Sequence, residues 1–139
     1  NNSGRHNLSV AESSYDTWLD GYRQGVKGRK GSIYVEGSVL ALMFDSRIMK
    51  VTDGKSSLST AMKILWERFG QPRTGIVANA YWDVLAEVAG ERLDDLREKY
   101  ADGTEDTWDD LVECMHANGL ALTKSMDEKG RVKATLQPA

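Results

Sequence analysis

The chain has few of the residues that cross-link small domains or bind metal ions. Among its 139 residues there is one cysteine, Cys114, and there are two histidines, His6 and His116. A single cysteine excludes an internal disulfide framework. No HExxH sequence occurs, the motif in which two histidines one helical turn apart bind zinc. We therefore expect no metal site within this chain, a buried thiol at Cys114 and a surface imidazole at His116.

Long hydrophobic runs and an excess of basic charge are also missing. No stretch approaches the roughly 18–20 uninterrupted apolar residues that a membrane span requires. The 18 Lys and Arg residues are outnumbered by 21 Asp and Glu residues. Residues 1–75 hold 11 basic and 7 acidic side chains, and residues 76–139 hold 7 and 14. An acidic balance of this kind lacks the basic footprint of a nucleic-acid-binding protein, so we predict neither a membrane span nor a nucleic-acid partner.

What the sequence does contain is a succession of amphipathic segments. Apolar residues recur at spacings of three and four, which is the period of one helix face, over residues 9–23, 32–52, 57–70, 79–90, 91–100 and 107–118. The tail alternates in residues 120–124 and 131–136 around a turn-prone Asp127-Glu128-Lys129-Gly130, a pattern typical of a β-hairpin. We predict a mainly α fold: a bundle of about five to six helices in residues 1–119, then a hairpin or linker in residues 120–139.

Three of these segments carry specific expectations. Ser9 and Glu12 have the spacing of a capping box, and the helix after Ser9 should pack on a neighbour through Tyr15, Trp18, Leu19 and Tyr22. The glycine-rich basic segment Gly25–Gly31 lacks P-loop spacing, and we interpret it as a flexible solvated connector. The helix after Ser57 should bury Leu58, Met62, Leu65, Trp66 and Phe69.

The segment Ser32–Thr52 is apolar around most of its circumference. A helix of this kind belongs in the interior of a larger structure. Its tyrosine, Tyr34, lies in the expected first turn, where backbone N–H groups are unpaired and the helix dipole is positive. Residue types alone allow two interpretations of Tyr34: a core residue with its hydroxyl at the rim, or a polar group placed for chemistry.

Three stretches resemble the glycyl aminopeptidase family of thermolysin-like zinc metallopeptidases, which often carry a PDZ domain. They are SSYDTWLDGY, SIYVEGSVLALMFDSRIMKVTDGKSSL and EVAGERLDDLREKYADGTED, and the resemblance spans roughly residues 8–122. It implies the C-terminal helical part of a gluzincin-like catalytic domain that releases small N-terminal residues such as glycine. The partners so implied are the upstream zinc-bearing half of that domain, a peptide substrate and a downstream PDZ domain, in a periplasmic or secreted protein.

The same resemblance implies a role for Tyr34. Tyr34-Val35-Glu36-Gly37 resembles the tyrosine-x-lysine-glycine signature of gluzincin aminopeptidases, in which the tyrosine donates a hydrogen bond to the oxyanion of the tetrahedral intermediate. Glu36 departs from the signature, which has lysine there. The zinc ligands would lie upstream of Asn1, so zinc is expected in the full-length parent protein and the isolated chain is expected to be inactive. The alternative is a non-catalytic helical binding or interaction module derived from the same fold.

Overall fold

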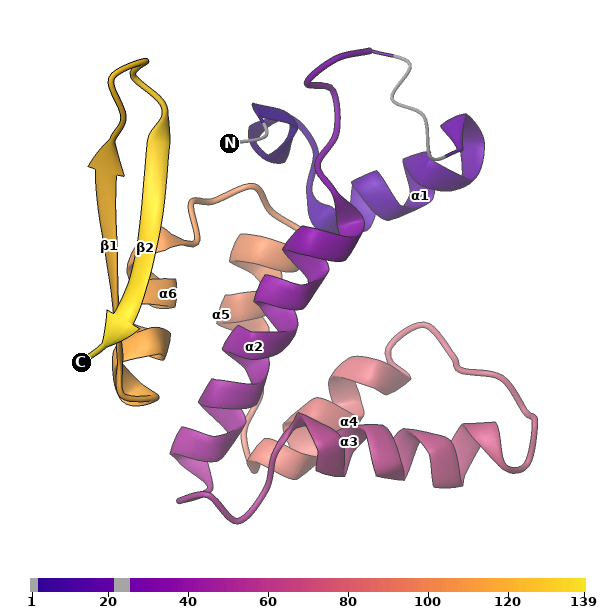
Figure 1. Cartoon of the computed structure of the whole chain (residues 1–139). Coiled ribbons are helices and arrows are strands. Elements are labelled where there is room, and N and C mark those ends of the chain that lie inside the picture. Colours follow the sequence, from indigo (N-terminus) through magenta and orange to yellow (C-terminus); the bar gives the residue numbers. More distant parts are fainter. Residues whose placement is uncertain (1–2, 22–25) are drawn as a thin grey trace. The chain divides into compact units, whose positions relative to one another are not determined.

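The computed structural model describes residues 3–21 and 26–139 (Figure 1). Within them the α-helices are α1 Val10–Asp20, α2 Ile33–Val51, α3 Leu58–Leu65, α4 Ala80–Ala89, α5 Asp94–Leu96 and α6 Trp108–Ala117. A 3-10 turn covers Ser3–His6, and π-helical turns cover Trp66–Gly70 and Arg97–Ala101. Strands β1 Leu120–Met126 and β2 Val132–Pro138 follow. The prediction of a mainly α fold with a C-terminal hairpin is confirmed.

The chain divides into two compact units. One consists of Asn1–Met43 with Arg97–Ala139, and the other of Phe44–Leu96. Helix α2 runs through the boundary between them. The hairpin belongs to the first unit together with α6, and the division of the chain after residue 119 stays a prediction. No helix in the described part of the chain has the length and hydropathy needed to cross a membrane.

The unit Phe44–Leu96 has an apolar core between the second half of α2, α3 and α4. Ile48, Ala61 and Leu85 are almost completely buried, and the rings of Phe44 and Trp82 lie 5.6 Å apart. Helix α3 begins where the Asp45 carboxylate accepts a hydrogen bond of 2.7 Å from the backbone N–H of Leu58. The first backbone N–H groups of a helix have no partner within the helix. Asp45 belongs to α2 and supplies an acceptor for one of them, so a side chain of α2 helps to fix where α3 begins.

The predicted inward face of α3 is partly wrong. Leu65 is buried as expected, whereas the Met62 and Trp66 side chains are exposed. The buried face is instead centred on Ala61 and Leu65. Met62 and Trp66 each follow one of these residues and therefore lie about 100° further around the helix. The apolar sector of this helix is wider than the surface that its own unit covers.

The C-terminal hairpin is defined by its turn. Its strands pair antiparallel with Leu120 opposite Pro138 and Met126 opposite Val132. Between them the Asp127 carboxylate accepts hydrogen bonds from the backbone N–H groups of Lys129 and Arg131, both at 2.9 Å. Gly130 has φ +70°, a conformation that glycine adopts without steric cost. On the α6 side, the Lys124 ammonium lies 4.0 Å from the centre of the Trp108 ring, a cation–π contact.

Helix α1 has its polar side inward. The capping box is confirmed, with hydrogen bonds of 2.9 and 3.1 Å between Ser9 and Glu12. The predicted packing face is wrong: the exposed fractions of Tyr15, Trp18 and Leu19 are 78%, 89% and 84%. Tyr22 lies outside the described residues, and the helix ends at Asp20 rather than near Arg23. The buried positions of α1 are Ser13 and Asp16.

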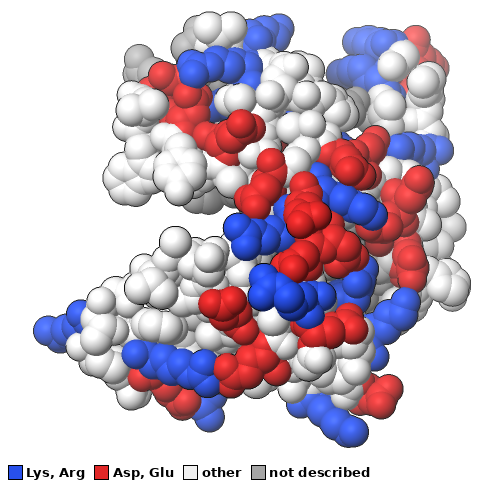
Figure 2. All heavy atoms as spheres, turned by 180° about the vertical axis from the view of Figure 1, so that it is seen from behind, with Lys and Arg blue, Asp and Glu red and all other residues white. Residues whose placement is uncertain are grey.

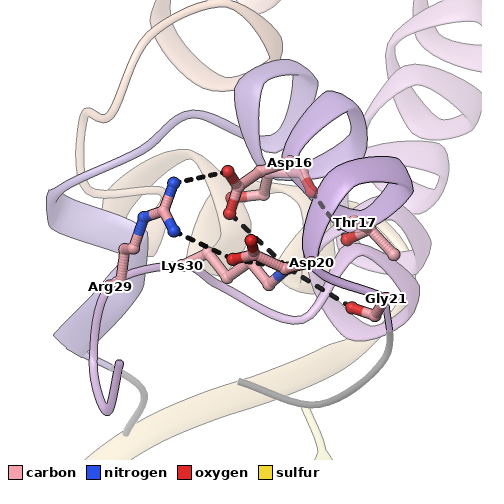
Figure 3. Close-up of polar contacts among 7 residues, drawn as sticks. Asp16, Thr17, Asp20, Gly21, Arg29 and Lys30 are labelled. Carbon is pink, nitrogen blue, oxygen red and sulfur yellow. Dashed lines mark hydrogen bonds and ion pairs between the residues drawn. The ribbon is translucent and has the colours of Figure 1, made fainter. Parts of the chain in front are cut away.

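The basic segment after α1 explains this inversion (Figure 3). The Arg29 guanidinium lies 2.6 Å from the Asp16 carboxylate and 2.9 Å from that of Asp20. Lys30 is only 5% exposed, and its Nζ lies 3.5 Å from Asp16 Oδ2. The interpretation of this segment as a solvated connector is therefore wrong at Lys30, which is buried, whereas Arg29 pairs with the acidic side of α1 and stays exposed. Gly25 lies outside the described residues.

Close packing of the backbone holds this segment in place. A Cβ atom added at Gly4 would collide with the carbonyl group of Lys30. Glycine at this position therefore lets the N-terminal 3-10 turn approach the backbone of residues 30–31. The hydroxyl of Ser13 is buried there and accepts and donates no hydrogen bond within the described part of the chain.

Candidate functional site

Tyr34 lies in the first turn of α2, as the sequence predicts. It is 65% exposed, and Val35 beside it is also exposed. Residues three, four and seven positions further along share its side of a helix, and these are Gly37, Ser38 and Ala41. A Cβ atom added at Gly37 would meet no described atom within 4 Å. The Tyr34 side of α2 is therefore a surface of small residues with room for another backbone.

Glu36, the departure from the family signature, lies on a different side of α2. Two residues along an α-helix correspond to a rotation of about 200°, so the Glu36 and Tyr34 side chains leave the helix in nearly opposite directions. The Glu36 carboxyl group folds back over Gly31, where an added Cβ atom would collide with it. The charge reversal at position 36 is thus directed away from the Tyr34 phenol.

The environment of Glu36 disfavours its ionised form. Burial raises the pKa of the Glu36 carboxyl above its ordinary value of 4.5, and the backbone N–H of Ser32 and the positive charges of Arg5 and His6 partly oppose this effect. At Glu36 the desolvation of the charged form outweighs the effect of these nearby partners. Glu36 therefore retains its proton to a higher pH than an exposed glutamate.

The Glu36 side of α2 borders a cavity of about 270 Å³. Tyr34 does not line this cavity, whose wall consists of Arg5, Leu8, Ser9, Val10, Ser32, Val35, Glu36, Val39, Leu40, Tyr100, Gly103, Thr104, Glu105 and Thr107. All of these residues belong to the unit Asn1–Met43 with Arg97–Ala139. Sequence reasoning missed the cavity, although Ser32, Glu36 and Val39 recur at helical spacing and so indicate one face.

Several polar groups of this wall already have partners. The Tyr100 hydroxyl donates a hydrogen bond of 2.7 Å to the Asp110 carboxylate. Burial and this bond raise the pKa of Tyr100 well above its usual range, so the phenol stays protonated. The Arg5 guanidinium lies 2.8 Å from the Asp106 carboxylate, and Ser9 Oγ accepts from Glu12 N–H. The Glu36 carboxyl interacts with the Ser32 N–H and with the charges of Arg5 and His6. Glu105 is an exposed acidic residue of the same wall.

The described side chains do not provide the ligand set that zinc requires. No group of three or more His, Cys, Asp or Glu residues is arranged to hold a metal ion within residues 3–21 and 26–139. Cys114 is buried and its thiol faces the Leu42 carbonyl at 3.9 Å, while His116 is exposed. The prediction of a buried thiol beside a surface histidine is confirmed.

Charges of both signs are mixed on the surface drawn in Figure 2, where Lys and Arg lie among Asp and Glu. Ion pairs in the described part of the chain include Arg92–Asp94 at 2.6 Å, Arg97–Asp102 at 2.9 Å and Arg68–Glu87 at 2.7 Å. Exposed pairs of this kind contribute little to stability. The absence of a nucleic-acid partner stays a prediction.

Comparisons of the chain with models of protein families, with curated proteins and with solved structures find no match. The resemblance to glycyl aminopeptidases therefore rests on the three sequence stretches quoted above. The role of Tyr34 and the dependence of the parent protein on zinc both stay predictions.

Proposed function

We propose that this chain is the C-terminal helical part of a zinc-dependent aminopeptidase that releases small N-terminal residues such as glycine, with Tyr34 as the oxyanion-stabilising residue. The observation that supports this best is the position of Tyr34. Its side chain is 65% exposed in the first turn of the longest helix, beside the open space at Gly37. A peptide and the zinc-bearing half of the domain require such an accessible surface.

The chemistry of a phenol suits this role. Tyrosine stays protonated near neutral pH and donates one hydrogen bond. A donor held where negative charge develops lowers the barrier by about 3 kcal/mol, and the positive end of the α2 dipole adds favourable potential. Zinc, bound by upstream residues in the full-length protein, would supply carbonyl polarisation and an activated water. The side-chain directions of Tyr34 and Glu36 support the proposal, because they separate the reversed charge from the phenol.

The test is Tyr34→Phe in the full-length protein, with hydrolysis of glycyl p-nitroanilide as the assay. We expect kcat to fall about 100- to 1,000-fold, while KM and the zinc content stay near the wild-type values. Tyr15→Phe is the matched control, because Tyr15 is also an exposed tyrosine on a helix of the same unit. An undiminished kcat in Tyr34→Phe would remove the catalytic assignment.

The second candidate function is a non-catalytic helical binding or interaction module. The aromatic face of α1, formed by Tyr15, Trp18 and Leu19, favours it, since large exposed apolar patches mark interaction sites. The charge of Glu36 within the signature favours it as well. The sequence upstream of Asn1 discriminates between the candidates: HExxH followed by a glutamate ligand supports the peptidase, and a parent protein without them supports the module.

A further inference from the structure

The cavity beside Glu36 is a second candidate site, distinct from Tyr34. Its volume of about 270 Å³ lies near the lower end of ligand pockets, which run from about 300 to 1,000 Å³. A dry engineered cavity of about 150 Å³ already binds benzene. The space therefore suits a molecule with one small ring or a short branched chain.

The wall of this cavity combines apolar surface with the carboxyl groups of Glu36 and Glu105. Leu8, Val39 and Leu40 provide aliphatic surface, and the Tyr100 ring adds an aromatic one. Glu36 and Glu105 form no ion pair within the described residues. Arg5, the cationic residue of the wall, is paired with Asp106 at 2.8 Å, and its positive charge also acts on Glu36. A ligand that matches this wall is apolar over most of its surface and positively charged at one end.

We propose that the cavity binds a small ligand with a protonated amine on a compact apolar body. The ammonium group would lie at the carboxyl groups of Glu36 and Glu105, and the apolar body would lie against Leu40 and the Tyr100 ring. A charge-assisted hydrogen bond is stronger than a neutral one, and a partly desolvated carboxylate gains most from an opposite charge. The proposal does not depend on the peptidase, because no cavity residue is Tyr34.

Three ligands of nearly equal shape test the charge preference. Benzylamine is cationic, benzyl alcohol is neutral and benzoate is anionic at pH 7.5. We expect two-dimensional NMR titrations of the full chain to give an affinity for benzylamine about tenfold higher than for benzyl alcohol, and no saturable binding of benzoate. The shifted amide signals should include Val39 and Thr104, which come from two separate segments of the wall. Equal affinities for the three ligands, or shifts elsewhere in the chain, would overturn the proposal.

Variants that remove one carboxylate charge distinguish binding of benzylamine in the cavity from a general attraction of cations to an acidic protein. Glu36→Gln should bring the benzylamine affinity down to about that of benzyl alcohol, and Glu105→Gln should lower it by a smaller factor because Glu105 is more exposed. Glu98→Gln is the matched control, since Glu98 is an exposed glutamate outside the cavity wall. Amide spectra that superimpose on the wild type show that each variant is folded. An unchanged benzylamine preference in folded Glu36→Gln and Glu105→Gln would contradict the proposal.

Discussion

Helices α1 and α4 are similar in length and amphipathic in sequence, and they use their apolar faces in opposite ways. In α4 the apolar residues Val84, Leu85 and Ala89 are buried. In α1 the expected inward residues Trp18 and Leu19 are among the most exposed side chains of the described chain. The same periodicity therefore accompanies a buried face in one helix and a solvent-facing one in the other.

The difference lies in what each helix meets within its own unit. Helix α4 packs on α3, whose Ala61 and Leu65 side chains offer an apolar surface. Helix α1 meets the basic residues Arg29 and Lys30, which pair with its acidic side. An ion pair that is removed from water needs close partners, so these contacts determine which side of α1 faces inward. Periodicity identifies an apolar face, and only a neighbour decides whether it is buried.

The largest expected effect is a difference in stability between two leucine variants, one in α4 and one in α1. Leu85→Ala in α4 should lower the free energy of unfolding by about 3 kcal/mol, because Leu85 is 1% exposed and its removal leaves a cavity. Leu19→Ala in α1 should change it by less than about 0.5 kcal/mol. Urea denaturation followed by circular dichroism measures both. Comparable losses in the two variants would mean that the α1 face is packed in solution.

The next prediction concerns the polar side of α1. Asp16→Asn should lower the free energy of unfolding by about 3 kcal/mol, because it removes the carboxylate charge that lies 3.5 Å from the buried Lys30 ammonium. Asp20→Asn is the matched control and should cost less than about 1 kcal/mol, since Asp20 is more exposed and lies 3.9 Å from Lys30 Nζ.

Combining Asp16→Asn with Lys30→Gln gives a second check on the same pair. Removing both charges should recover part of the loss, because a neutral pair costs less to bury than a single charge. A double variant as unstable as the sum of the two single variants would show that Asp16 and Lys30 do not interact energetically.

The smallest effect is pH-dependent and concerns Glu36. Its pKa is higher in the folded chain than its ordinary value of 4.5, so folding favours the protonated carboxyl. The stabilisation is fully present below about pH 4.5 and is lost as the pH rises through the raised pKa. Glu36→Gln should therefore raise the melting temperature slightly at pH 7.5 and leave it unchanged near pH 4. Arg5, His6 and the Ser32 N–H favour the ionised form and limit the effect.

A change in melting temperature of Glu36→Gln that is the same at pH 4 and pH 7.5 would contradict this assignment. Glu98→Gln serves again as the exposed control.

Local signals account for most of the fold that could be predicted. The capping box at Ser9, the hairpin around Asp127 and the helix ends at Gly54 and Gly90 each depend on residues within a few positions of one another. The position of Tyr34 in the first turn of α2 follows from the same local reasoning. The cavity could not be predicted in this way, because Arg5, Glu36 and Glu105 come from three distant segments.

By itself the sequence determined where the helices and the hairpin form, which faces are apolar, and that Tyr34 lies in the first turn of the longest described helix. These properties follow from periodicity, caps and turn residues, which act over a few positions. The tertiary structure alone decided that Lys30 is buried, that Trp18 is exposed and that Glu36 turns away from Tyr34 toward a cavity. Burial and pairing require a partner from elsewhere in the chain, and a pattern within one segment does not specify that partner.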